Sequence, residues 1–241
     1  MKKILVLLLI TPLFAFSQNS PYSVNLRGAD TTHHRKPTRR DTLKVARFSA
    51  GLSFCEQDCY RYLRADPAYA ATITYRNSTE IAKYGFTSGM NFAYRVNENL
   101  ALESGAWFSN QGYQVSASAS SSSFTLNYNY LTLPLKANIC IPLEGSSVYL
   151  SVGLAANISI GQEAEDGGIG INSTLNPQYF PNFTWANLAT LLGIGSDIRI
   201  SQIAYLKIEP NFMRSFTPAV NGNVKEYMYS VGLNIALFIY P

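Results

Sequence analysis

The sequence predicts an all-β fold: an eight-stranded antiparallel up-and-down transmembrane β-barrel with short turns at one end and long loops at the other. Three observations lead to this prediction. From about residue 44 onward, apolar residues alternate with small or polar ones, as expected when successive side chains of a strand point to opposite faces. Short and long connections alternate between the predicted strands. Only 14% of the 241 residues are charged, whereas 47% are hydrophobic, which leaves few charges to cover a soluble surface.

The alternation is clearest between residues 84 and 109. In residues 84–96 one face is small or polar and the other is bulky, with Tyr84, Phe86, Met90, Phe92, Tyr94 and Val96. Residues 100–109 repeat the pattern after a tight turn at 97–99, which predicts a β-hairpin. The same period predicts six more strands, in residues 47–54, 131–141, 148–158, 186–200, 204–212 and 227–239. No window shows a helical period with capping residues, so no helix is expected.

The connections between these strands differ in length in a regular way. Turn-sized segments alternate with longer polar ones along the chain: 56–82, 97–99, 111–123, 142–147, 161–184, 201–203 and 215–225. An even number of antiparallel strands with this asymmetry is typical of outer-membrane barrels. We therefore expect short periplasmic turns and long extracellular loops.

The contents of the two strand faces distinguish a membrane barrel from a soluble one. A soluble barrel would point its bulky face inward, but side chains already fill an eight-stranded interior, which has no room for so many large rings. We predict that the bulky residues face lipid and that Gly, Ser, Ala and Asn fill a narrow lumen. Aromatic residues near the strand ends are expected to form interfacial girdles, unless they fill the lumen: Phe54, Tyr84, Phe108, Tyr113, Phe124, Tyr128, Tyr130 and Trp185 at one end, and Tyr94, Tyr149, Tyr205, Phe238 and Tyr240 at the other.

The charged residues of the predicted strands fall on the small-residue face. On a lipid face each would cost up to ~2–4 kcal/mol at mid-depth, whereas in a lumen opposite charges can pair. We expect Arg95 to lie diagonally opposite Glu103 across the hairpin. The network could form a selective pore or a proton path, but eight strands leave no open channel, which favours a structural plug. The predicted luminal charge network comprises Arg95, Glu103, Lys136, Asp197, Arg199, Lys207 and Glu209.

The N-terminal region precedes the barrel, which is predicted to span residues 45–241. Residues 1–17 are predicted to be a signal peptide, because two lysines precede an apolar run that ends at small residues. Residues 18–44 are predicted to be a basic, disordered periplasmic leader, either a docking segment or a solvated linker. Residues 18–47 carry seven basic residues against two acidic ones. The net charge of +4 therefore resides in the N-terminal region and does not indicate nucleic-acid binding by the barrel.

The cysteines and histidines limit the chemistry that the chain can perform. Cys55 and Cys59 lie in a polar stretch of an exported chain, which predicts a small disulfide, while Cys140 is expected to be buried. Both histidines, His33 and His34, lie in the leader. A metal site would need more ligands than these cysteines offer, and a catalytic site would need a base. We therefore predict no catalytic residues, no metal, no cofactor and no enzymatic activity.

Several short motifs between residues 84 and 135 carry a family resemblance. They are Gly89, Val96-Asn97-Glu98-Asn99-Leu100, Gly105, Gln111-Gly112-Tyr113 and Tyr130-Leu131-Thr132-Leu133-Pro134-Leu135. With these motifs in order, residues 46–240 resemble the PorT-like outer-membrane β-barrel family of Bacteroidetes. The resemblance implies an eight-stranded outer-membrane barrel and, through the founding member, a link to secretion and gliding machinery.

These features predict a non-enzymatic integral outer-membrane barrel that is a structural or interaction component of the cell envelope. The alternative is a narrow channel or small-ligand transporter. We expect outer-membrane lipid around the barrel. Envelope protein partners are expected at loops 56–82 and 161–184 or at the basic leader.

Overall fold

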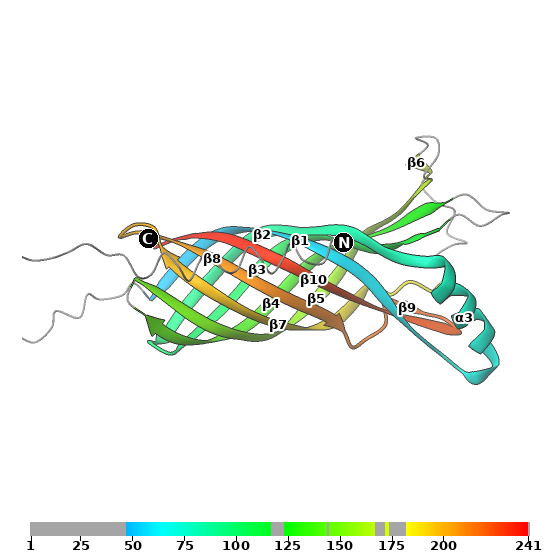
Figure 1. The fold of residues 1–241 in the computed structure, drawn as a ribbon, viewed down its shortest axis with the longest axis horizontal. Helices are drawn as coiled ribbons and strands as arrows, with labels where there is room; N and C mark the ends of the chain where they lie inside the picture. The colour runs from blue at the N-terminus through cyan, green and yellow to red at the C-terminus, as the bar shows by residue number, and fades with distance from the viewer. Residues whose placement is uncertain (1–46, 117–122, 144, 167–171, 174–181, 241) are drawn as a thin grey trace, which may run out of the picture. The chain divides into compact units, whose positions relative to one another are not determined.

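The computed structural model describes residues 47–116, 123–143, 145–166, 172–173 and 182–240, all within the compact unit Lys44–Pro241. Eight long antiparallel strands form a closed ring (Figure 1), since each pairs with the next and the first pairs with the last. The predicted all-β, up-and-down barrel is confirmed. The predicted signal peptide and leader lie outside the described residues. The strands are β1 (Phe48–Ala65), β2 (Glu80–Asn97), β3 (Leu100–Val115), β4 (Phe124–Leu143), β5 (Ser146–Asp166), β7 (Ala186–Arg199), β8 (Ala204–Ser215) and β10 (Val224–Ile239).

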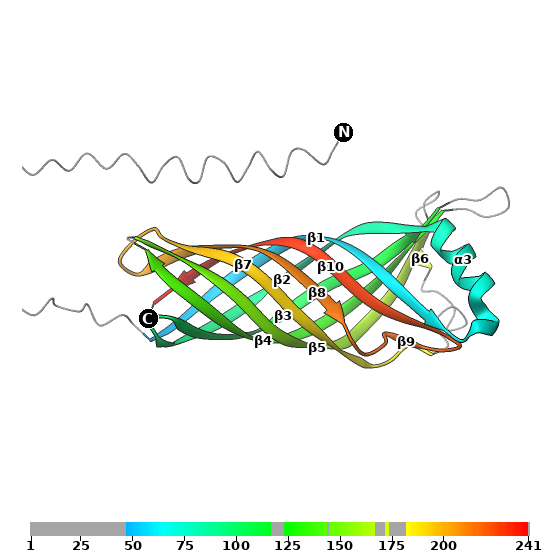
Figure 2. The same cartoon turned by 60° about the horizontal axis from the view of Figure 1, so that its bottom comes forward.

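The two ends of the barrel differ as the sequence predicts. Short connections join β2 to β3, β4 to β5 and β7 to β8, and β1 begins and β10 ends at this same end. The longer connections lie at the opposite end (Figure 2). This long-loop end carries the 3₁₀ helix η2 (Pro67–Tyr69), the helix α3 (Ala70–Thr79) and the two-residue strands β6 (Asn172–Ser173) and β9 (Val220–Asn221). No helix in the described ranges is long and apolar enough to cross a membrane.

The structure corrects the predicted loop 56–82. β1 continues to Ala65, α3 occupies Ala70–Thr79 and β2 begins at Glu80. The helix escapes sequence-based prediction because it has no buried residue and no capping side chain at its N-terminus. Its segment is also rich in β-branched residues, which lower helix propensity.

The two faces of the strands have the predicted contents. On β2, Met90 and Phe92 are exposed on the outer surface, whereas Asn91 and Ala93 are buried inside. Several aromatic residues expected in the girdles instead fill the interior, because they belong to the inward-facing set of their strands. Six of these are almost completely buried: Tyr113, Tyr128, Tyr130, Tyr149, Tyr205 and Phe238.

The predicted disulfide between Cys55 and Cys59 is wrong. Both residues lie on β1, where a rise of ~3.3 Å per residue separates Cα atoms four positions apart by ~13 Å. A disulfide requires Cα atoms within about 7 Å. Both side chains are buried free thiols, as is that of Cys140. The polar stretch that resembled a turn is the continuation of β1, with Gln57 and Cys59 pointing into the barrel.

Candidate functional site

A network of ion pairs, the luminal ion network, crosses the interior toward the short-turn end. At its centre is Glu103 on β3, which is 1% exposed. Its carboxylate lies 2.5 Å from Lys207 Nζ and 3.0 Å from Lys136 Nζ. Lys136 also lies 3.1 Å from Glu209. Because β8, which carries Lys207 and Glu209, is not a neighbour of β3 or β4 in the ring, these ion pairs bridge the lumen.

The edge of this network reaches Asp197 on β7. Asp197 lies 4.0 Å from Lys207 and 3.9 Å from Arg95. The structure thus brings together six of the seven predicted residues. Arg95 does not pair with Glu103, because two lysines already occupy the carboxylate of Glu103. Arg199 is exposed and forms no ion pair with the described residues.

Neutral polar groups complete the luminal ion network. Tyr149 donates a hydrogen bond of 2.8 Å to Glu209, and Asn138 donates one of 2.9 Å to Glu103. Lys136 also lies 5.6 Å from the centroid of the Trp107 ring. Since charges are stable in an interior only when they are paired and hydrogen-bonded, this arrangement explains how a narrow lumen holds so many.

Two cavities beside the luminal ion network are both small. A cavity of about 20 Å³ lies beside Trp107, Lys136 and Glu209, and another of about 10 Å³ lies beside Arg95 and Asp197. A single water needs roughly 10–15 Å³ on this measure. Each cavity therefore has room for about one water and not for a hydrated ion or an organic solute.

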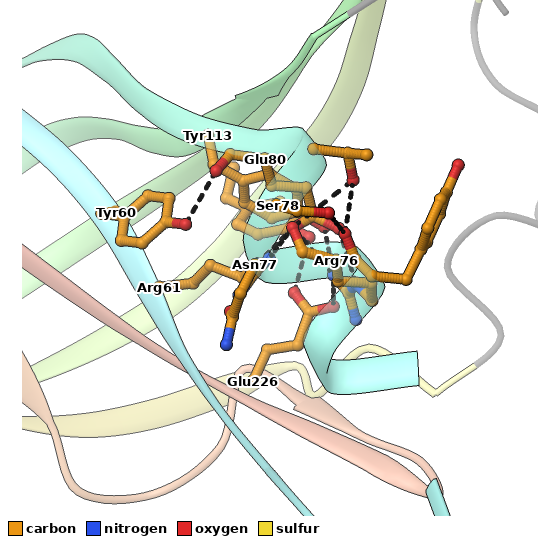
Figure 3. Close-up of polar contacts among 11 residues, drawn as sticks. Tyr60, Arg61, Arg76, Asn77, Ser78, Glu80, Tyr113 and Glu226 are labelled. Carbon is orange, nitrogen blue, oxygen red and sulfur yellow. Dashed lines mark hydrogen bonds and ion pairs between the residues drawn. The ribbon is translucent and has the colours of Figure 1, made fainter. Parts of the chain in front are cut away.

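A second network, the cap network, lies at the long-loop end and consists of Arg61, Arg76, Glu80 and Glu226 (Figure 3). Arg76, on α3, lies 2.6 Å from Glu80 and 2.6 Å from Glu226, and it donates a hydrogen bond of 2.8 Å to Tyr113. Arg61 on β1 pairs with the other oxygen of Glu80. The cap network therefore ties α3 to β1, β2, β3 and β10.

Arg61 also holds the C-terminal part of α3. Its guanidinium donates hydrogen bonds of 3.2 Å to the side chain of Asn77 and to the backbone carbonyl of Arg76. The carbonyl of Arg76 also accepts the helical hydrogen bond from the backbone N–H of Glu80, so Arg61 adds a second donor at the C-terminal end of α3. α3 is thus held by side chains of the barrel and not by burial of an apolar face.

Electrostatics keeps the cap network charged. Burial by itself would lower the pKa of Arg76, but the nearby carboxylates of Glu226 and Glu80 outweigh burial and raise that pKa above its ordinary value.

Next to Arg76, the rings of Tyr113 and Tyr128 meet edge to face, and Phe183 packs against Tyr128. Aromatic rings therefore pack directly against the cap network and hydrogen-bond to it.

The sequence contains a signal for part of the cap network. The inward-facing set of β1 continues without interruption through Gln57, Cys59, Arg61 and Leu63. Extending the period-two pattern beyond residue 54 would have placed Arg61 in the lumen. Arg76 has no such signal, because it lies on a helix that the pattern does not reveal.

The sequence matches the model of one protein family. A family model described as "Outer membrane protein beta-barrel domain" matches residues 62–221. No curated protein matches the chain.

Solved structures include barrels with a similar course of the chain. Neisserial surface protein A is 14% identical, with a TM-score of 0.45, and the match covers 80% of this chain and 97% of that one. OprG from Pseudomonas aeruginosa is 13% identical, with a TM-score of 0.38 and coverage of 78% and 94%. The outer membrane protease OmpT from Escherichia coli is 8% identical, with a TM-score of 0.42 and coverage of 80% and 96%. At these identities the likeness concerns the fold alone. Because the family model matches most of the barrel, the chain belongs to the outer membrane protein β-barrel domain family.

Proposed function

We propose that this protein is a closed, non-enzymatic outer-membrane anchor that presents its helical cap to a protein partner of the cell envelope. The observation that supports this proposal is the filled lumen. Ion pairs cross the interior between Glu103 and Lys207 and between Lys136 and Glu209, while the cavities beside them have room for about one water each.

Transport through this lumen would require the buried ion pairs to separate. Breaking a buried pair costs ~3–5 kcal/mol, because it leaves an uncompensated charge in a poorly polarisable interior. The cap network adds a second closure, in which Arg76 is held by Glu80 and Glu226. A plugged barrel is therefore favoured over the alternative, a narrow channel or small-ligand transporter.

The cap offers a surface that the barrel leaves uncovered. No residue of α3 is buried, and Tyr75 is 61% exposed. Exposed tyrosines supply rigid contact area at protein interfaces. The resemblance of residues 46–240 to the PorT-like family supports a partner in secretion machinery. The loop 161–184 and the leader, also expected to contact partners, lie mostly or wholly outside the described residues.

Photo-crosslinking in native outer membranes tests the role of the cap. A photoreactive residue in place of Tyr75 is expected to give a discrete protein adduct, because this position projects from the cap. The Arg76→Gln substitution should weaken that adduct by releasing α3. The matched control places the same residue at Glu98, in the exposed short turn. No adduct from position 75, or the same adduct from both positions, would contradict an interaction through the cap.

A further inference from the structure

Three basic residues on the outer surface of the barrel have no acidic partner among the described residues. Arg64 on β1 lies directly opposite Lys225 on β10, and Arg214 on β8 lies opposite Tyr229 on β10. All three are exposed. We call Arg64, Lys225 and Arg214 the basic patch. Like charges directly opposite each other on a sheet repel, so a bound anion would relieve an unfavourable pairing in the free protein.

A group of tyrosines adjoins the basic patch on the same outer face. Tyr60 packs edge to face on Tyr229, with ring centroids 5.9 Å apart, and Tyr62 lies beside Tyr227 at 6.4 Å. The guanidinium of Arg214 lies 5.7 Å from the centroid of the Tyr62 ring. Tyrosines favour the boundary between hydrocarbon and headgroups. The basic patch and these rings therefore have the composition of a membrane interface.

The strand geometry places the basic patch above the apolar band. β1 and β10 run side by side from the short-turn end to the end that carries α3 (Figure 2). Counted from Phe48, the first residue of β1, strands tilted by ~40° reach about 25 Å along the barrel axis at Asp58, about 30 Å at Tyr60 and about 40 Å at Arg64. The apolar band of an outer-membrane barrel is ~25 Å tall. The band thus ends near the exposed Asp58, Tyr60 lies just above it, and Arg64 and Lys225 lie above the tyrosines.

The surface below the basic patch is suited to acyl chains and excludes anionic groups. Ile235 and Leu237 are exposed on the outer face of β10, 46% and 47% respectively, opposite the exposed Phe54 and Leu52 of β1. Between this apolar surface and the tyrosines, the outer face of β1 exposes Glu56 and Asp58. These carboxylates repel a phosphate from deeper positions, so an anionic amphiphile is held with its charge at the basic patch and its chains against β10.

We propose that the basic patch binds the phosphate groups of a glycolipid in the outer leaflet. The basic patch lies above an apolar surface of β10. This arrangement favours a lipid over a free anion, because a free anion would contact only the three basic residues. This site goes beyond the proposed anchor function, and a failure of lipid binding would leave the closed lumen and the cap unaffected.

Binding of bisphosphorylated lipid A to the full chain in detergent micelles tests this site, with native mass spectrometry as the readout. We expect the wild-type protein to retain this lipid more strongly than fully dephosphorylated lipid A. The triple variant Arg64→Gln/Arg214→Gln/Lys225→Gln should lose at least roughly tenfold in affinity, since each basic residue near an anionic surface contributes to binding. Arg199→Gln, which removes an exposed cation at the opposite end, is the matched control and should bind like wild type.

Three results would overturn the proposal. One is equal retention of the phosphorylated and dephosphorylated lipids by the wild-type protein. Another is unchanged affinity in the triple variant, provided that its heat-dependent mobility in gels shows a folded barrel. The third is complete displacement of lipid A by excess inorganic phosphate, which would indicate a site for free anions.

Discussion

The substitution Glu103→Gln is expected to lower the free energy of unfolding by about 3 kcal/mol or more. The reason is that Lys207 and Lys136 would remain buried after losing the carboxylate that lies 2.5 and 3.0 Å from them. Removing one partner from a buried ion pair costs ~3–5 kcal/mol. Urea unfolding of the protein in lipid vesicles measures this loss through tryptophan fluorescence, to which the buried Trp107 beside Lys136 contributes.

Three further variants show whether the luminal ion network causes this loss. Glu98→Gln, in an exposed turn, should change the unfolding free energy by less than about 0.5 kcal/mol. The double variant Glu103→Leu/Lys207→Met should be more stable than Glu103→Leu alone, because it removes a cation that would otherwise be buried with fewer partners. Equal stabilities for Glu103→Gln and Glu98→Gln would show that Glu103 does not stabilise the barrel.

The substitution Arg76→Gln is expected to release α3 while the barrel stays folded. Arg76 contributes two ion pairs of 2.6 Å and a hydrogen bond of 2.8 Å, whereas α3 has no buried residue and its other contacts from Arg61 are two hydrogen bonds of 3.2 Å. Hydrogen bonds to charged groups contribute ~1.5–3 kcal/mol each, so local opening should become at least roughly tenfold more frequent. Cleavage by chymotrypsin after Tyr75 reports this opening, because proteolysis follows the population of the open form.

The matched control for α3 is Thr72→Ser, an exposed position one turn earlier on the same helix. Its cleavage rate should equal that of the wild-type protein. If Arg76→Gln were also cleaved at the wild-type rate, the side chain of Arg76 would not be what holds α3 in place.

The barrel could be predicted because the pattern that determines it, the alternation of side chains along each strand, is local in the sequence. Period-two alternation sets the face of every side chain from its place on the strand, so the outward position of Phe92 and the inward position of Glu103 follow from the sequence alone. The partners of Glu103 could not be derived in this way. Lys207 is 104 positions away along the chain, and its approach depends on how the ring closes.

The long-loop end was less predictable, for different physical reasons. The helix α3 is held by Arg61, Arg76 and Glu80 and not by an apolar stripe, so it has no periodic signal. The disulfide hypothesis failed because polarity around Cys55 and Cys59 resembles a turn, whereas in a lumen polar residues belong to a strand. The girdle hypothesis failed for residues such as Tyr149 because they belong to the inward-facing set of their strands. The hydroxyl of Tyr149 donates a hydrogen bond to Glu209 inside the barrel.

Conductance of the full-length protein in planar bilayers tests the central claim, a closed lumen, most directly. The account predicts no discrete openings at any holding voltage, because buried ion pairs bridge the lumen and the two cavities beside them hold about one water each. A known pore-forming peptide added to the same bilayer serves as the positive control. Discrete openings that disappear or change amplitude in Arg95→Gln or Glu103→Gln would contradict the account and show that the lumen conducts.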